Sequence, residues 1–225
     1  MNDHSSKQFD AELDTIRAHL TRMGGMVEEQ VRDVLVAFGT SNRELLEQVI
    51  VRDQAVDELE VIIDAACANI IAKRQPTASD LRLIMAVGKV VTDLERIGDE
   101  AKKIAKTTRD ILARSMGEHL IQAIEVRHMG EQTARMLHEV LNAFVRLDTD
   151  TASQIVRRDK EVDQHFRAIL RQLVTYMMED PRTISTALDV IFIAKSVERI
   201  GDHAKNIAKD VIYIAQGRDV RHLAL

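Results

Sequence analysis

A thirteen-residue motif occurs twice in this chain. The segment LERIGDEAKKIAK begins at Leu94 and returns as VERIGDHAKNIAK at Val197, 103 residues later. Solenoid proteins repeat units of roughly 20 to 50 residues, so a period this long indicates that a whole helical bundle has been duplicated. The part that recurs most faithfully is a Glu-x-x-x-Asp pair with its Arg, Ile, Gly, Ala and Lys neighbours. The duplication is therefore the best lead to both fold and function.

Each half of the chain carries three stripes of apolar residues at helical spacing. The stripes cover 13–38, 46–70, 84–105, 121–144, 155–177 and 188–211. Residues three and four apart share one face of a helix, so each stripe predicts a long helix. Gly24 and Gly25 lie inside the first stripe and can bend that helix. No segment of useful length alternates as a strand does.

Turn residues separate the stripes at matching places in the two halves. Residues 39–42 give a glycine stop followed by Asn42 as an N-cap, and residues 147–150 break the second half. The two prolines, Pro76 and Pro181, come just before the last helix of each half, where a missing N–H group costs little. The pattern predicts an all-α fold of two tandem three-helix bundles, residues 1–113 and 114–225.

Composition narrows the class of protein. The chain has no Trp, two Tyr and five Phe, so its core must be aliphatic. The net charge is −5 and no basic block occurs, which argues against nucleic-acid binding. No apolar run is long enough to span a bilayer and the N-terminus has no signal-peptide core, so we expect a cytoplasmic protein. The single cysteine, Cys67, fits a reducing compartment and is expected to be a buried thiol.

Acidic residues recur in pairs four positions apart. The last helix of each half carries a Glu–Asp pair, the middle helix an Asp–Asp pair, and the pairs occupy corresponding places in the repeat. The candidate residues are Asp53, Asp57, Glu95 and Asp99 in the first half and Asp159, Asp163, Glu198 and Asp202 in the second. Side chains at i and i+4 lie one helical turn apart on one face. If the flanks of the two helices adjoin, four carboxylates converge at a shallow site in each bundle.

Converging carboxylates require shifted pKa values or a bound cation. Oxygen ligands suit hard cations such as Mg, Ca, Mn and iron, whereas structural zinc sites favour Cys and His. The competing interpretation is that acidic pairs on charged helices are solvated surface. That interpretation is the more common one for a single pair, and the recurrence of equivalent pairs in both halves weakens it.

Other residues of the motif have simpler explanations. Arg96 and Arg199 are expected to pair with neighbouring carboxylates, and Gly98 and Gly201 to allow close helix packing, because no glycine-rich phosphate loop is present. His203 adjoins Asp202, but its counterpart in the first copy is Glu100, so we do not count it as a ligand. A ferritin-like di-iron enzyme needs paired Glu-x-x-His motifs, and only residues 125–128 match, which disfavours oxidase chemistry.

Together, the doubled Glu-Arg-Ile-Gly-Asp motif, the Phe9-Asp10-x-Glu12-Leu13 opening and the two Arg-Asp-x-x-Val-Asp motifs resemble the PhoU family. The resemblance covers nearly the whole chain. It implies two three-helix bundles with iron or zinc clusters on their surfaces, held by Glu/Asp-x-x-x-Asp motifs that match the eight acidic residues named above. The first copy departs from many family copies by having Glu100 in place of His.

The resemblance also implies a function without catalysis. A family member of this kind is a cytoplasmic negative regulator of inorganic phosphate uptake. When phosphate is plentiful, it restrains the phosphate ABC transporter by contact with the transporter ATPase, and it keeps the phosphate-sensing histidine kinase from activating its response regulator. Family members commonly form homodimers and reach the membrane only through these partners.

Two rival functions remain open at the level of the sequence. The first is a metal-dependent enzyme or metal-storage protein that uses the same carboxylates. The second is a structural helical scaffold whose acidic pairs are solvated. Elemental analysis and turnover assays on the purified protein separate these rivals from a metal-binding adaptor.

Overall fold

A computed structural model describes residues 3–114, 123–218 and 220. Within these ranges the chain forms six α-helices, one short 3-10 helix and no strand. They are α1 (Asp3–Thr40), α2 (Arg43–Arg74), α3 (Ala78–Arg114), α4 (Ala123–Arg146), α5 (Thr149–Glu179), η1 (Pro181–Thr183) and α6 (Ile184–Gln216). The predicted all-α class is confirmed. The predicted boundary between residues 113 and 114 falls at the end of α3, and Ile121 of the fourth stripe lies outside the described residues.

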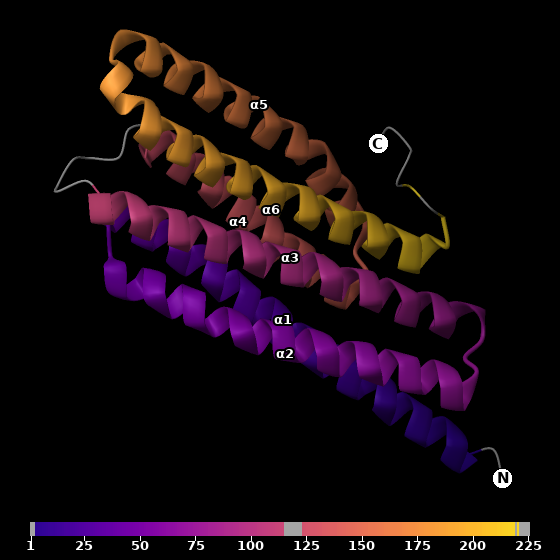
Figure 1. Ribbon diagram of the computed structural model, residues 1–225. Helices are drawn as coiled ribbons and strands as arrows, with labels where there is room; N and C mark the ends of the chain where they lie inside the picture. Colours follow the sequence, from indigo (N-terminus) through magenta and orange to yellow (C-terminus); the bar gives the residue numbers. More distant parts are fainter. Residues whose placement is uncertain (1–2, 115–122, 219, 221–225) are drawn as a thin grey trace.

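The helices form two bundles that lie side by side. Helices α1, α2 and α3 pack on one another, as do α4, α5 and α6. Between the bundles, α3 packs against α6 and α1 packs against α4, which leaves α2 and α5 on opposite outer sides (Figure 1). The last helix of each repeat, which carries the doubled motif, therefore lies at the centre of the molecule.

The turns predicted from the sequence have the same construction in both bundles. Asn42 caps α2 by accepting a hydrogen bond from the Leu45 N–H, and Asp148 caps α5 by accepting from two backbone N–H groups. The residue before each cap, Ser41 or Leu147, has a left-handed backbone with φ near 50° (53° and 52°). An N-cap of this kind stabilises a helix by about 1 kcal/mol, so each turn sets where its next helix begins.

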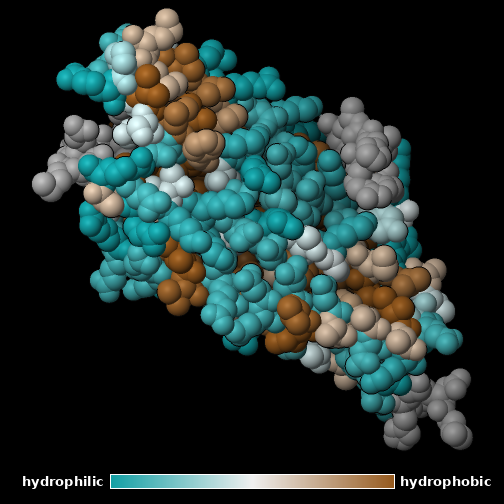
Figure 2. Space-filling view, viewed as in Figure 1, coloured by the Kyte–Doolittle hydropathy of each residue, from teal (hydrophilic) through white to brown (hydrophobic). Residues whose placement is uncertain are grey.

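The core is aliphatic and runs through both bundles as one cluster. Most residues of the predicted stripes are buried in it, but two members, Ile124 and Leu188, are 74% and 43% exposed. Both lie off the buried face of their helices, since Val126 beside Ile124 and Ala187 beside Leu188 are 0% exposed. Figure 2 shows a mostly hydrophilic face on which apolar side chains gather where α5 ends and α6 begins.

The structure shows the packing around the two glycines of α1 and around Cys67. Helix α1 continues unbroken through Gly24 and Gly25. Gly24 is needed for close contact between bundles, because a Cβ atom there would lie 2.9 Å from Cδ2 of Leu141 in α4. Cys67 is buried as expected, and burial, with a contribution from Asp64, raises the pKa of its thiol to about 11. No helix in the described part of the chain is long and apolar enough to cross a membrane.

Candidate carboxylate sites

The four predicted acidic residues of the first bundle lie on the same side of the α2–α3 pair. Burial and the charges of Asp53 and Asp99 raise the pKa of Asp57. Burial and the charge of Asp99, followed by smaller effects that include Asp57, raise the pKa of Glu95. Carboxylates perturb one another in this way only at short range. The structure therefore brings together the acidic pairs that the sequence placed on separate helices.

A fifth carboxylate extends this first cluster. Burial and the charges of Asp64, Asp57 and Asp99 raise the pKa of Glu60, which lies one turn after Asp57 on α2. Glu60 was not among the predicted residues. Its signal was present, since positions 53, 57 and 60 follow the i, i+4, i+7 spacing of one helix face.

Asp53 forms the floor of the first cluster. It is 1% exposed, whereas Asp57 is exposed and Glu95 and Asp99 are half-buried. A Cβ atom at Gly98 would lie 3.1 Å from Oδ1 of Asp53 and 3.2 Å from Oε1 of Gln30. Gly98 thus makes room for a buried carboxylate between three helices, as the close-packing interpretation predicted. Gln30 is itself buried, and neither of its amide atoms has a hydrogen-bond partner among the residues that the structure describes.

Lys102 supplies the positive charge that Asp53 needs. Its Nζ donates to Oδ2 of Asp53 over 2.6 Å and lies 3.9 Å from Oδ1 of Asp99. The hydrogen bond to Asp53, together with the surrounding negative charges, raises the pKa of Lys102. A buried carboxylate is tolerated only when it is paired, so this lysine is part of the site. Sequence reasoning missed it, although it recurs in both copies of the motif as Lys102 and Lys205.

The second bundle repeats this arrangement. Asp159 is buried, and Lys205 Nζ donates to it and, over 3.1 Å, to Oδ1 of Asp202. Burial raises the pKa of Asp159 despite the nearby lysine, and the charges of Asp202 and Asp163 add to that shift. Burial alone would lower the pKa of Lys205, but its two hydrogen bonds outweigh that effect and raise it.

The two clusters differ at their glutamates. In the second bundle, Lys195 donates to both carboxylate oxygens of Glu198 at 2.6 Å, so this glutamate is neutralised by its own helix. In the first bundle, Glu95 lies 3.3 Å from the neighbouring Arg96 but stays under the influence of the other carboxylates. Uncompensated negative charge is therefore concentrated in the first cluster.

The remaining charged residues of the motif join the bundles to each other. Glu100 is 2% exposed and pairs with Lys103 at 2.9 Å and with Arg199 of α6 at 3.0 Å. Nδ1 of His203 lies 2.7 Å from Oδ1 of Asp93 in α3. Glu100 and His203 thus contribute to the α3–α6 contact rather than to the carboxylate clusters. The expected pairing of Arg96 and Arg199 with carboxylates is confirmed.

Replacing Glu95 with Gln is expected to stabilise the protein at pH 7 in the presence of a chelator, by a few tenths of a kcal/mol. A carboxyl group with a raised folded-state pKa favours folding fully only below its unfolded-state pKa, and that contribution is lost as pH rises through the folded-state pKa. The advantage of Gln should therefore disappear towards pH 4. Urea unfolding at both pH values measures it, and an advantage that grows on acidification contradicts the assignment.

The carboxylate oxygens of these clusters suit a bound cation, but Lys102 and Lys205 already pair with the buried aspartates. Carboxylate oxygens are the ligands that Mg, Ca and Mn prefer. Across the described ranges, however, no three His, Cys, Asp or Glu side chains are placed so that they could hold a metal ion. A metal at Asp53 would have to displace Lys102. Metal binding at the eight predicted residues therefore stays a prediction.

Comparison with known proteins agrees with the duplicated architecture. The PhoU domain model matches residues 20–108 and 126–211, once in each bundle. The phosphate-specific transport system accessory protein PhoU homolog of Pseudomonas aeruginosa is 49% identical over 225 residues, covering 100% of this chain and 92% of the relative. The accessory protein PhoU of Escherichia coli is 48% identical over 223 residues, covering 99% and 91%.

Solved structures match at the level of the whole fold. The crystal structure of PhoU from Pseudomonas aeruginosa superposes with a TM-score of 0.90 at 48% identity, covering 93% of this chain and 100% of that one. The phosphate transport system regulatory protein PhoU from Streptococcus pneumoniae gives a TM-score of 0.85 at 27% identity, covering 94% and 99%.

Proposed function

Because this chain belongs to the PhoU family, we propose that it is a cytoplasmic negative regulator of inorganic phosphate uptake and of the phosphate-starvation response. The observation that carries the proposal is the near-complete overlap, at 48% to 49% identity, with proteins named as accessory proteins of a phosphate-specific transport system. The protein acts as an adaptor, without catalysis, between the ATPase of the phosphate ABC transporter and a phosphate-sensing histidine kinase, and it forms a homodimer.

The carboxylate clusters give this adaptor a means of regulation. Bound metal, iron or zinc as the family resemblance implies, or Mn, Mg or Ca, would neutralise the carboxylates and change the surface that partners meet. Asp53, Asp57, Glu95 and Asp99 would hold it in the first bundle, and Asp159, Asp163, Glu198 and Asp202 in the second. The first cluster is the stronger candidate for metal binding, because Glu198 of the second cluster already pairs with Lys195.

Apolar residues are exposed where α5 ends and α6 begins, and Phe192 is one of them. They support an adaptor role, since such patches favour protein contacts.

Deletion of the gene tests the regulatory role in cells. We expect expression of the phosphate-starvation phosphatase to rise in phosphate-rich medium, because the kinase is no longer restrained, and to fall again when the intact gene is supplied on a plasmid. A reporter fused to the phosphatase promoter measures both effects. An unchanged response in the deletion strain contradicts the proposal.

Binding to the two partners tests the adaptor mechanism. The purified protein should retain the transporter ATPase and the kinase in pull-down experiments, with retention that changes when metal is removed by a chelator. Phosphatase or ferroxidase turnover by the purified protein with Mn or Fe would instead favour a metal-dependent enzyme.

A further inference from the structure

A pocket of about 370 Å³ opens between α1 and α4, where the two bundles meet. Three arginines line it, one from α1 and two from α4, above a floor of apolar side chains. The residues on which the argument depends are Arg32, Leu35, Val36, Arg127, Ala134 and Arg135. The pocket shares no residue with the carboxylate clusters.

The charge of this pocket is opposite to that of the chain as a whole. Among its described lining residues the single carboxylate is Glu131, which lies 3.6 Å from Arg127. Arg32 and Arg135 make no hydrogen bond or ion pair with any residue that the structure describes. Three guanidinium groups and one carboxylate leave a net charge of about +2 in a protein whose net charge is −5. All three arginines are exposed to solvent along this pocket, so Arg32 and Arg135, together with Arg127 beside Glu131, are accessible to an anion.

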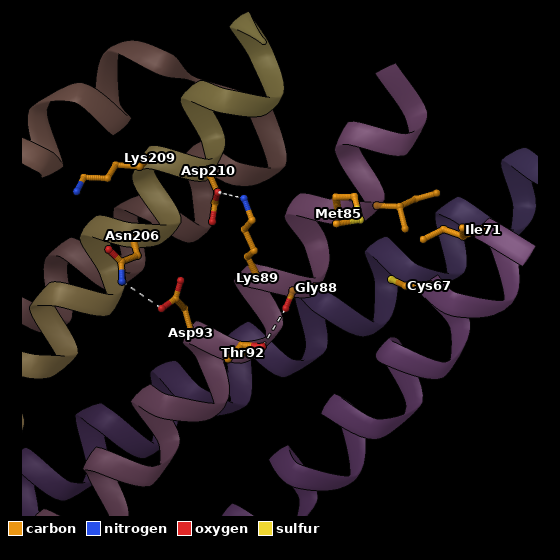
Figure 3. A pocket seen from close by; sticks show the side chains of 11 residues that line it. Cys67, Ile71, Met85, Gly88, Lys89, Thr92, Asp93, Asn206, Lys209 and Asp210 are labelled. Atoms are coloured by element: carbon orange, nitrogen blue, oxygen red, sulfur yellow. Dashed lines mark hydrogen bonds and ion pairs between the residues drawn. The ribbon is translucent and has the colours of Figure 1, made fainter. Parts of the chain in front are cut away.

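A larger pocket in the described part of the chain does not share this property. It measures about 620 Å³ and is lined by residues of α2, α3 and α6. Figure 3 shows Lys89 directed at Asp210, to which it pairs over 3.7 Å, and Asn206 directed at Asp93. Its two lysines are matched by two aspartates, so no positive charge is left over.

The duplication gives an internal comparison for the arginine pocket. The 103-residue offset relates Arg32 to Arg135, but it relates Arg127 to Gly24 and Val36 to Glu139. The related surface on the other side of the α1–α4 contact holds a pocket of about 170 Å³, in which Glu28 lies 2.9 Å from His138. Gly39 adds to the asymmetry, because a Cβ atom there would lie 3.2 Å from Cδ of Arg127. The pocket on one side of the α1–α4 contact is thus cationic, whereas the pocket on the other side is not.

We propose that this pocket binds a small phosphate-bearing anion, with the phosphoryl group against the guanidinium groups of Arg32, Arg127 and Arg135. A phosphate monoester carries a charge of about −1.5 to −2 at pH 7, which matches the charge of the pocket, and a carboxylate carries less. Arginine binds phosphate oxygens through a planar set of N–H donors. The apolar floor of Leu35, Val36 and Ala134 accommodates the organic part of an esterified phosphate. The site is independent of the proposed regulatory role.

Isothermal titration calorimetry on the purified full chain tests the site with three probes, inorganic phosphate, AMP and adenosine, at low ionic strength. We expect AMP to bind and adenosine not to bind. Binding of inorganic phosphate as tightly as AMP identifies the free ion as the ligand. The double variant Arg32→Ala with Arg135→Ala should weaken binding at least tenfold, whereas Arg157→Ala with Arg167→Ala, which removes two exposed arginines of α5, should leave it unchanged.

A second variant separates loss of the site from loss of the fold. Val36 is 49% exposed, so Val36→Glu introduces a carboxylate into the pocket without disturbing the core. This variant should keep the thermal unfolding temperature of the wild type and lose anion binding. The proposal is overturned if neither phosphate nor AMP binds at millimolar concentration, or if either variant binds them as the wild type does.

Discussion

Replacing Lys102 with Met is expected to lower the free energy of unfolding by about 3 kcal/mol, because it leaves a buried carboxylate without its partner. Asp53 is 1% exposed, and Lys102 Nζ at 2.6 Å is the cation that neutralises it. Met preserves the length and the apolar contacts of the lysine stem, so the loss reports mainly on the charge. Urea unfolding at pH 7 in the presence of a chelator measures the change.

Two further variants isolate the cause of this loss. Lys106→Met removes an exposed lysine one turn further along α3 and should change stability by less than about 0.5 kcal/mol. Asp53→Asn combined with Lys102→Met removes both charges and should recover much of the lost stability, because no unpaired charge then remains in the core. Lys205→Met should behave like Lys102→Met, since Asp159 is buried in the same way. A Lys102→Met protein as stable as the Lys106→Met protein contradicts the assigned role.

Most of the fold could be predicted because it depends on local patterns. Apolar stripes at helical spacing fix which segments are helices, and side chains such as Asn42 and Asp148 mark where helices begin. The duplicated motif indicates how the helices group into bundles. Exposure at the ends of helices was harder to predict. Leu188 continues an apolar stripe but is 43% exposed, whereas Ala187 and Val190 at the same level are buried, so the buried face there is shifted from the one that the stripe predicts.

The candidate site was predicted only in part, because its chemistry depends on contacts between helices. In the first bundle, the acidic residues of the i, i+4 pairs lie near one another, whereas in the second bundle Glu198 pairs with Lys195. The depth of Asp53 depends on Gly98 and on Gln30 of α1, which lie far apart in the sequence. Lys102 has the appearance of a solvated lysine on a charged helix, and only its hydrogen bond to α2 shows its role. The pairing of Glu198 with Lys195 is a matter of side-chain conformation that no sequence pattern specifies.

The carboxylate clusters are expected to bind metal, and removal of two carboxylates from each cluster should abolish metal binding. We expect protein purified without added metal to contain iron, zinc or manganese by elemental analysis. Asp57→Asn with Asp99→Asn should remove the metal of the first bundle, and Asp163→Asn with Asp202→Asn that of the second. Asp10→Asn with Asp14→Asn is a matched control, because it changes an exposed i, i+4 pair on α1. Metal retained by the protein with all four site substitutions refutes the assignment.

Thermal unfolding with and without added metal can show whether a metal ion and Lys102 compete for Asp53. A divalent ion stabilises a protein according to its affinity for the folded state. In the wild type, a metal ion must displace Lys102 from Asp53, whereas in Lys102→Met that carboxylate is unpaired. Added Mn or Zn should therefore raise the unfolding temperature of Lys102→Met more than that of the wild type, and Asp53→Asn with Lys102→Met should lose this extra stabilisation. Equal shifts in all three proteins would mean that metal, if it binds, does so away from Asp53.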